Sequence, residues 1–351
     1  MSDNKQQNRF LYLDLLRILA AFSVVMLHSA AQFWYSLDIH SSEWIIANSY
    51  NAISRFGVPI FVMISGAIFL SPDYKLDIKR LYTHNILRIA IIYMVWSTLY
   101  GLFDSIWLFH FPSMTIKDIL REIIGGRYHL WFLPMIVGIY VLLPVLKSWL
   151  EHAEKQNVQY FISLFVILQI GIETFRAFTV SDEIHTLLNL TYVEMACGYI
   201  GYFIWGYYLA HIGINSNIKK FFLFNAFPAL FLNVFWGNLL SLQRDLRSTT
   251  IYDSFSAFTF VFVTALFVFF QAKEPTISKN CSLIISAISS STLGIYLFHI
   301  AFMEYTQSLG LHSMMVPIII GIPLYAIICF IICLLVSTIL RKLPFIGKYI
   351  C

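Results

Sequence analysis

Charged residues are scarce in this chain of 351 residues: Asp, Glu, Lys and Arg together make up 12%, about half of their share in an average soluble domain. Hydrophobic residues make up 59%, and the mean hydropathy is +0.73. A chain with so few charges cannot cover a soluble surface in the usual way. The composition therefore excludes an ordinary soluble protein and predicts a polytopic membrane protein surrounded by membrane lipids.

The familiar motifs of soluble enzymes are also absent. The sequence has no glycine-rich phosphate-binding loop, no zinc-ligand motif and no nucleophile elbow. It has no basic soluble patch, so we expect no nucleic-acid partner. The five cysteines form no disulfide framework. Cys329 and Cys333 share a face of the last hydrophobic segment, but two thiols in apolar surroundings make a weak metal site, so we expect structural thiols and no metal.

No Pro/Ser-rich linker, low-complexity tract or obvious internal repeat divides the chain. The polar start MSDNKQQNRF runs directly into a full-length hydrophobic segment without a small-residue cleavage site. We therefore expect no cleavable signal peptide. We also expect a single integral membrane domain over residues 1–351, with no appended soluble domain.

Long hydrophobic segments are what the sequence has in abundance. Ten of them are long enough to cross a bilayer as α-helices. They lie at roughly 11–34, 48–70, 85–108, 129–149, 158–178, 190–211, 221–240, 252–271, 284–306 and 315–340. The sequence thus predicts an all-α membrane bundle of about ten transmembrane helices. In the second segment, Ser65 and Gly66 are small residues of the kind that let two membrane helices pack closely.

Lysine and arginine are distributed unevenly between the two ends of these segments. If the N-terminus is cytoplasmic, the inner segments hold fifteen of the 23 basic residues and the outer loops hold six, while Arg17 and Arg55 lie within helices. Cytoplasmic loops of membrane proteins carry an excess of basic residues. We therefore expect both termini to be cytoplasmic, as an even number of helices requires.

Arg17 and His28 lie within the first hydrophobic segment, LLRILAAFSVVMLHSA. Eleven residues separate them, which at about 100° per residue amounts to three turns plus about 20°, so both side chains point to one face. The rise per residue puts them roughly 16 Å apart along the helix axis. Ionisable residues inside a membrane usually face a bundle interior or a wet cavity and mark a functional path. We therefore expect the chemistry at this pair.

The expected topology sorts the ionisable residues of the helices into two layers. The inner layer is cationic and consists of Arg17, Arg80 and Arg88. The outer layer is mixed, and it consists of His28, Arg55, His129, Glu194, His299 and Glu304, with Trp131 beside His129. Plainer interpretations exist: an arginine near a helix end can be a snorkelling anchor. Likewise, a histidine next to a tryptophan fits an aromatic belt at the membrane interface.

Four stretches resemble acyltransferase family 3, a family of integral membrane proteins, and within it the small stand-alone members of the enterobacterial common antigen type. They are YLDLLRILAAFSVVMLHS, SRFGVPIFVMISGAIFL, YHLWFL and SSSTLGIYLFHI. Each stretch alone is a weak signal, but four in the family's order, together with about ten helices, make a specific match. Many relatives carry two arginines three residues apart at the start of the third helix. Here Asn85 stands three residues before Arg88, so only Arg88 matches.

The resemblance implies an O-acyltransferase of the bacterial inner membrane. Such an enzyme would move an acyl group, usually acetyl, from acetyl-CoA to a hydroxyl of a carbohydrate or glycolipid acceptor. The inner arginines suit the phosphates of the donor. His28, with Arg17 on the same face, is the catalytic candidate, because a neutral imidazole can take the proton of the attacking hydroxyl. The candidates for binding the acceptor are Arg55, His129, Trp131, Glu194, His299 and Glu304.

One interpretation from another class fits the same composition. In a transporter or flippase of a saccharide or lipid-linked intermediate, these polar residues would line a path and catalyse nothing. The sequence shows no paired broken helices in matching halves, which many secondary transporters have. A purely structural membrane subunit would leave the buried ionisable residues without a role.

Overall fold

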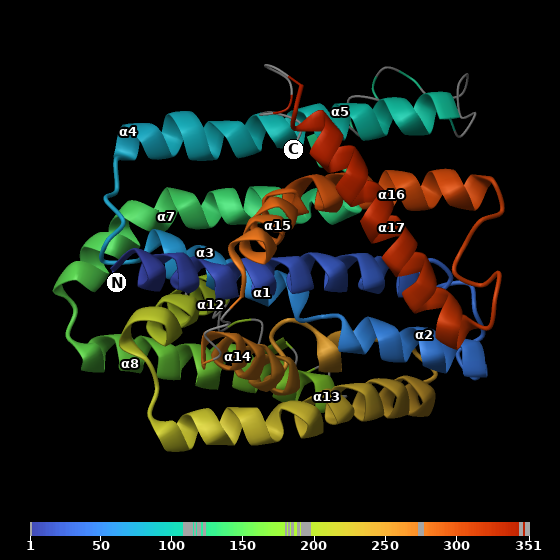
Figure 1. Ribbon diagram of the computed structural model, residues 1–351. Coiled ribbons are helices and arrows are strands. Elements are labelled where there is room, and N and C mark those ends of the chain that lie inside the picture. The colour runs from blue at the N-terminus through green and yellow to red at the C-terminus, as the bar shows by residue number, and fades with distance from the viewer. Residues whose placement is uncertain are drawn as a thin grey trace.

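The structure is a computed structural model that describes the chain apart from Met1, residues 273–276 and parts of 108–123, 180–197 and 344–351. The described residues are helical and include no strand (Figure 1). The first half of the chain forms α1 (Ser2–Ala31), α2 (Ser42–Ile53), α3 (Gly57–Phe69), α4 (Ile78–Arg80), η1 (Leu81–Ile86), α5 (Leu87–Trp107), η2 (Tyr128–Trp131), α7 (Phe132–His152), α8 (Lys155–Leu164), η3 (Phe165–Gly171) and α9 (Ile172–Phe178).

The second half contributes the remaining helices of the bundle. They are α12 (Gly198–Tyr207), η4 (Tyr208–Ile212), α13 (Ser216–Arg244), η5 (Thr250–Tyr252), α14 (Ala257–Ala272), α15 (Lys279–Ser290), α16 (Thr292–Ser308) and α17 (Ile318–Leu340). Polar side chains fix several helix starts: Asn215 accepts a hydrogen bond from the backbone N–H of Ile218 at the start of α13. Such a cap satisfies one of the backbone donors that a helix start leaves open.

Within the described residues, eight helical segments are long and apolar enough to cross a membrane. The pair α15 and α16 passes the same criterion as a ninth, although its two helices are bent by 53° at their junction. These findings confirm a polytopic helical bundle. Residues 191–197 of the predicted segment 190–211 fall outside the described residues. The helices that follow, α12 and η4 (Gly198–Ile212), are largely buried and together too short to be counted among the eight.

Helix α1 lies at the centre of the bundle. It packs against α2, α3, α14, α15, α16 and α17, and Figure 1 shows it between neighbouring helices on both sides. Because neighbours surround it, Arg17 and His28 lie among protein groups, and neither has to face lipid.

Small residues allow the closest helix contact. A Cβ atom added to Gly66 of α3 would lie 1.8 Å from the backbone oxygen of Phe203, and one added to Gly206 of α12 would lie 2.1 Å from that of Met63. Only glycine fits at such distances, so the expected packing role of Gly66 is confirmed.

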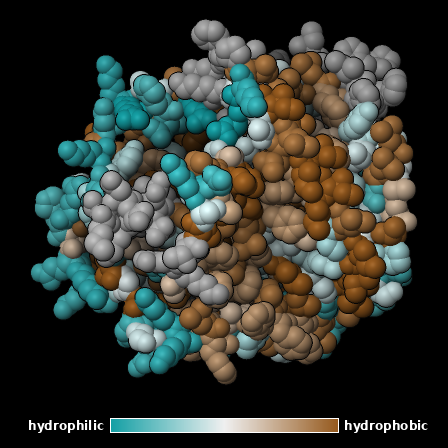
Figure 2. All heavy atoms as spheres, in the orientation of Figure 1, coloured by the Kyte–Doolittle hydropathy of each residue, from teal (hydrophilic) through white to brown (hydrophobic). Residues whose placement is uncertain are grey.

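The structure brings together loops that the charge distribution assigns to the same side of the membrane. His40 Nε2 lies 3.1 Å from Asp245 Oδ1, and both residues belong to predicted outer loops. Near the opposite end of the bundle, Lys147 Nζ donates a 2.8 Å hydrogen bond to the Ser71 carbonyl. Hydrophilic side chains gather at the left edge of the molecule in Figure 2, the end at which the N-terminus lies.

Candidate active site

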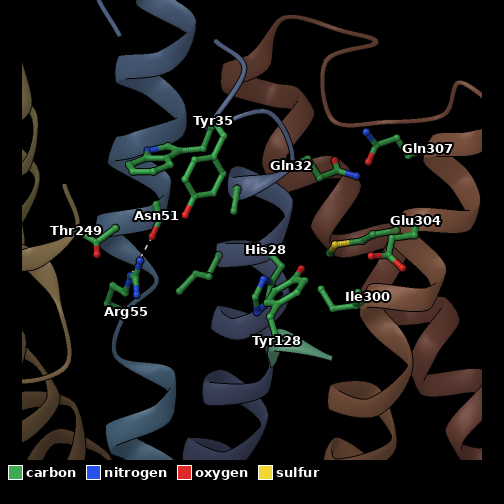
Figure 3. Close-up of a pocket in the computed structure, with 14 residues that line it drawn as sticks. His28, Gln32, Tyr35, Asn51, Arg55, Tyr128, Thr249, Ile300, Glu304 and Gln307 are labelled. Carbon is green, nitrogen blue, oxygen red and sulfur yellow. Dashed lines mark hydrogen bonds between the residues drawn. The ribbon is translucent and has the colours of Figure 1, made fainter. Parts of the chain in front are cut away.

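Two cavities meet at the His28 side chain. The first, which we call the Arg17 cavity, has a volume of about 430 Å³ and extends between α1, α3, α7 and the α15–α16 junction. The second, which we call the Arg55 cavity, has a volume of about 570 Å³ and lies between α1, α2 and α16 (Figure 3). His28 belongs to the lining of both. A group bound in either cavity can therefore reach the same imidazole.

The Arg17 cavity has cationic groups at the end away from His28. Three arginines line it, Arg17, Arg88 and Arg341, and none of the described lining residues is acidic. Arg17 Nη1 donates to Ser289 Oγ at 3.1 Å and to Asp14 Oδ1 at 3.3 Å. Because the described lining holds three cations and no acid, the cavity is suited to an anionic ligand.

The break between α15 and α16 provides hydroxyl groups to the same cavity. Ser289 and Ser290 end α15 and line the cavity, and the chain then bends at Ser291. Arg341, which follows α17, donates from Nη1 to Ser290 Oγ at 2.5 Å and to Ser291 Oγ at 3.1 Å. Ser337 Oγ donates to the Ser291 carbonyl at 3.0 Å. These bonds satisfy backbone and side-chain groups at the break, which is how a broken membrane helix is tolerated.

Apolar side chains line the Arg17 cavity between the arginines and His28. They are Val24, Val58, Phe61, Phe132 and Leu293. Arg17 and His28 are roughly 16 Å apart along α1. The lining of this cavity therefore combines arginines and serines with apolar side chains, and it includes His28.

The Arg55 cavity carries amides, tyrosines and one charge of each sign. Its polar lining residues are His28, Gln32, Tyr35, Asn51, Arg55, Tyr128, Thr249, Glu304 and Gln307. In Figure 3, Asn51 and Arg55 lie on one side of His28, and Glu304 and Gln307 lie on α16 on the other side. Several planar hydrogen-bonding groups thus converge on one space next to the histidine.

Both charged residues of the Arg55 cavity are held by neighbours. Arg55 Nε donates to Asn51 Oδ1 at 3.0 Å, its guanidinium carbon lies 5.4 Å from the centre of the Tyr252 ring, and Asp253 lies 3.9 Å from its Nη1. Glu304 accepts a hydrogen bond from Arg127. These contacts leave the net charge of the cavity lining low and its side chains preorganised.

Three histidines form a cluster at the meeting point of the cavities. The His28 and His299 rings are 5.0 Å apart between centroids, and the His129 and His299 rings are 5.3 Å apart. His129 and His299 are buried, whereas His28 is partly accessible through the cavities. Tyr128 lies 5.7 Å from His28. No group of three or more His, Cys, Asp or Glu residues in the described part of the chain could hold a metal ion.

The structure places the predicted site residues in several groups. Arg17, Arg88 and His28 line one cavity, so the expected common face of Arg17 and His28 is confirmed. Arg55 and Glu304 line the other cavity together with His28.

Three residues predicted to bind the acceptor, His129, Trp131 and His299, do not line the Arg55 cavity. His129 and Trp131 line the Arg17 cavity and not the Arg55 cavity, because the short 3-10 turn η2 directs Tyr128 and His129 to different sides. His299 lies behind His28 and lines neither cavity. Glu194 falls outside the described residues.

Arg80 is exposed and lines neither cavity. Eight residues separate it from Arg88, and at about 100° per residue this leaves the two side chains about 80° apart around a regular helix. The π-helical segment Leu81–Ile86 between them changes this angle further, because its residues per turn differ from those of an α-helix. Of the three arginines of the predicted inner layer, Arg17 and Arg88 thus line the cavity, whereas Arg80 lies outside it, and its expected contact with the donor stays a prediction.

Several lining residues were not predicted from the sequence. From the sequence, Arg341 is one of the fifteen basic residues of the inner segments, and Ser289 and Ser290 belong to the stretch SSSTLGIYLFHI. The signal for the serines is a run of four polar residues, SSST, inside a hydrophobic segment. Gln32 and Asn51 gave no distinct signal, because single amides near helix ends are common.

The comparison with known families agrees with this geometry. The model of the family described as "Acyltransferase domain" matches residues 10–342. The chain belongs to acyltransferase family 3. It is therefore a membrane-embedded acyltransferase, and the match includes the whole of both cavity linings. Searches of curated proteins and of solved structures each found no match.

Proposed function

We propose that this acyltransferase moves an acetyl group from acetyl-CoA to a hydroxyl of a cell-surface or lipid-linked carbohydrate. The observation that carries the proposal is that a cationic cavity and a polar, nearly charge-balanced cavity share one histidine. Two substrates of different charge can thus approach the same imidazole from two sides. A transporter needs no such shared residue between two unlike cavities.

The Arg17 cavity fits the donor. Coenzyme A carries several phosphate charges, and guanidinium groups bind phosphate through paired, charge-assisted hydrogen bonds. Arg17, Arg88 and Arg341 would hold these phosphates, with Ser289 and Ser290 as further hydrogen-bonding groups. The apolar side chains of this cavity would contact the slender pantetheine arm, which would carry the thioester towards His28.

The Arg55 cavity fits a carbohydrate acceptor. Its volume lies in the range of small-molecule sites, which is roughly 300–1,000 Å³. Amides such as Gln32 and Asn51 can both donate to and accept from sugar hydroxyls. Tyr128 and Tyr35 offer ring faces beside them. Arg55 would hold the sugar or stabilise the negative charge that develops on the thioester oxygen.

The reaction follows from this placement. The acceptor hydroxyl gives its proton to a nitrogen of His28 as its oxygen forms a bond to the thioester carbonyl carbon. The carbon–sulfur bond then breaks, and the proton on His28 passes to the coenzyme A thiolate. His28 would thus act as general base and then as general acid, and it ends the cycle neutral.

The charge distribution would put the donor site on the cytoplasmic side. It assigns the N-terminal end of α1, with Arg17, to the cytoplasm and the Arg55 cavity to the opposite side. Single cysteines introduced near 40, 115 and 245 should then react with an impermeant label in intact cells, whereas those near 75, 155 and 275 should not. Labelling of the second group would reverse the proposed sides. Each of these cysteines is introduced into a variant in which the five native cysteines are replaced.

The test of the proposed function is transfer by purified protein in lipid. Radiolabelled acetyl-CoA is incubated with a panel of saccharides and lipid-linked saccharides, among them those of the enterobacterial common antigen type. We expect label in a saccharide with the parent protein and none above background with His28→Ala. Saccharide flux into proteoliposomes without acetyl transfer would contradict the proposal and favour the flippase.

A further inference from the structure

No described residue forms a hydrogen bond that would fix the protonated nitrogen of the His28 imidazole. Its ring contacts Tyr128 and His299, but neither ring nitrogen has a hydrogen-bond partner among the described residues. A histidine that serves as a base needs one nitrogen with a free lone pair and the other with the proton. In the serine protease triad an aspartate holds the second nitrogen and thereby sets the tautomer.

His299 has the opposite property, because its own tautomer is determined by the fold. Its Nδ1 lies 2.6 Å from the Tyr296 carbonyl oxygen. A carbonyl oxygen can only accept, so Nδ1 carries the hydrogen and donates. In the neutral ring, Nε2 then carries the lone pair. This Nε2 atom is buried and has no partner in the part of the chain that the structure describes.

Helix α16, which carries His299, is held in place on two sides. Tyr100 Oη of α5 donates to the Leu297 carbonyl at 2.8 Å and accepts from the Ala301 N–H at 3.1 Å. The Tyr296 hydroxyl donates to the His129 carbonyl. The acceptor nitrogen of His299 is therefore part of a fixed frame, and an unpaired buried acceptor in such a frame is costly unless a donor reaches it.

We propose that His299 positions His28. Its Nε2 accepts a hydrogen bond from one N–H of the His28 ring and leaves the other nitrogen of His28 free to take the acceptor's proton. The two ring centroids are 5.0 Å apart with a tilt of 46°, so a rotation of the His28 ring brings donor and acceptor together. The arrangement replaces the charged aspartate of a triad with a neutral acceptor. This proposal rests on the role of His28 as the base in the proposed function.

Glu304 does not provide this hydrogen bond. Its carboxylate accepts from Arg127 and lines the far side of the Arg55 cavity. The third histidine, His129, lies 5.3 Å from His299, and the structure places it in the wall of the Arg17 cavity. Among the described neighbours of His28, His299 is the one whose lone pair is fixed by a backbone carbonyl.

Two isosteric substitutions separate the two nitrogens of His299. In His299→Asn the side-chain NH₂ can still donate to the Tyr296 carbonyl, but nothing remains at the position of Nε2. In His299→Gln the longer side chain can place its carbonyl oxygen near that position and accept from His28. A purely structural role of the Nδ1 bond predicts that Asn is tolerated better than Gln. The proposed role predicts the reverse.

The first measurement is the tautomer of His28, and it does not depend on the acceptor. Nitrogen NMR of histidine-labelled protein in nanodiscs distinguishes protonated from unprotonated ring nitrogens. We expect one tautomer of His28 in the parent and in His299→Gln, and a mixture in His299→Asn. A His28 tautomer that is unchanged in His299→Asn would overturn the proposal, even if acetyl transfer itself proceeds as proposed.

The second measurement is steady-state transfer. We expect kcat to fall by about 10²-fold in His299→Asn, at the lower end of the range for loss of acid–base function, and by at most about tenfold in His299→Gln. The KM for acetyl-CoA should stay within about twofold, because His299 lines neither cavity. His211→Asn is the matched control, since His211 also contacts a backbone carbonyl, that of Ala67, at 2.7 Å but lies outside both cavities. A parental kcat in His299→Asn would contradict the proposal.

Discussion

The two cavities on either side of His28 differ in how their charges are arranged. In the Arg17 cavity, three arginines face a space without an acidic lining residue, and Arg341 contacts neutral serines. In the Arg55 cavity, Arg55 is stacked near Tyr252 and close to Asp253, and Glu304 is paired with Arg127. An excess of positive charge favours an anionic ligand, whereas balanced, preorganised polar groups favour a ligand with many neutral hydroxyls. Under the proposed function, this difference would direct donor and acceptor to separate cavities.

The largest effect is expected at the residue that the cavities share. His28→Ala should reduce kcat for acetyl transfer by about 10²–10⁴-fold, because the acceptor hydroxyl loses its base. Binding of coenzyme A should stay close to that of the parent. Steady-state transfer and equilibrium binding of radiolabelled coenzyme A are the measurements. Activity within a few-fold of the parent would remove His28 as the base.

The next effect concerns the donor cavity alone. Arg17→Ala should raise the KM for acetyl-CoA by roughly ten- to a hundredfold, since a hydrogen bond to a charged group contributes about 1.5–3 kcal/mol. Arg17→Lys should have a smaller effect, because lysine keeps the charge but lacks the paired donors of arginine. An unchanged KM in the alanine variant would favour a snorkelling anchor.

Arg341 tests whether the serine break belongs to the donor site. Arg341→Ala should raise the KM for acetyl-CoA by about tenfold, but it should leave the use of acetyl-pantetheine, which has no phosphates, unchanged. Lys342→Ala is the control, because Lys342 is exposed and lines neither cavity. Equal loss with both donors would mean that Arg341 supports the fold at the α15–α16 break and does not bind phosphate.

The acceptor cavity should respond in the opposite way. Arg55→Ala should lower kcat/KM for the acceptor by roughly tenfold or more, while the KM for acetyl-CoA stays near that of the parent. Asn51→Ala should cause a smaller loss of the same kind, because Asn51 orients the Arg55 guanidinium. If Arg55→Ala weakened the donor instead, the assignment of the two cavities would be reversed.

The smallest difference expected is between two arginines of one segment. Arg88→Ala should raise the KM for acetyl-CoA several-fold, and Arg80→Ala should raise it less, because Arg80 is exposed and lies outside the cavity. Kinetics of both variants at low and high salt compare them directly. A larger effect at Arg80 would favour a donor site that includes the whole predicted cationic layer.

The sequence predicts the bundle and the central pair well, for a physical reason. Hydrophobic runs determine where helices lie, and helical periodicity alone places Arg17 and His28 on one face. Periodicity within one segment cannot show how separate helices meet. Arg341 lines the cavity and contacts Ser290 and Ser291 at the junction where α15 and α16 are bent by 53°.

The depth of a residue in the membrane also proved insufficient to assign its cavity. His129 and Tyr128 are adjacent, yet they face different cavities because a 3-10 turn separates their directions. His299 shares the level of His28 but lies behind it. Local backbone geometry of this kind depends on tertiary packing, which the hydrophobic pattern does not record.

The most direct test of the account is equilibrium binding of radiolabelled coenzyme A to four proteins in nanodiscs: the parent, Arg17→Ala, His28→Ala and Arg55→Ala. Separate cavities that meet at His28 predict at least about tenfold weaker binding to Arg17→Ala, and binding to His28→Ala and Arg55→Ala within about twofold of the parent. Equal weakening in Arg17→Ala and Arg55→Ala would contradict two separate substrate sites.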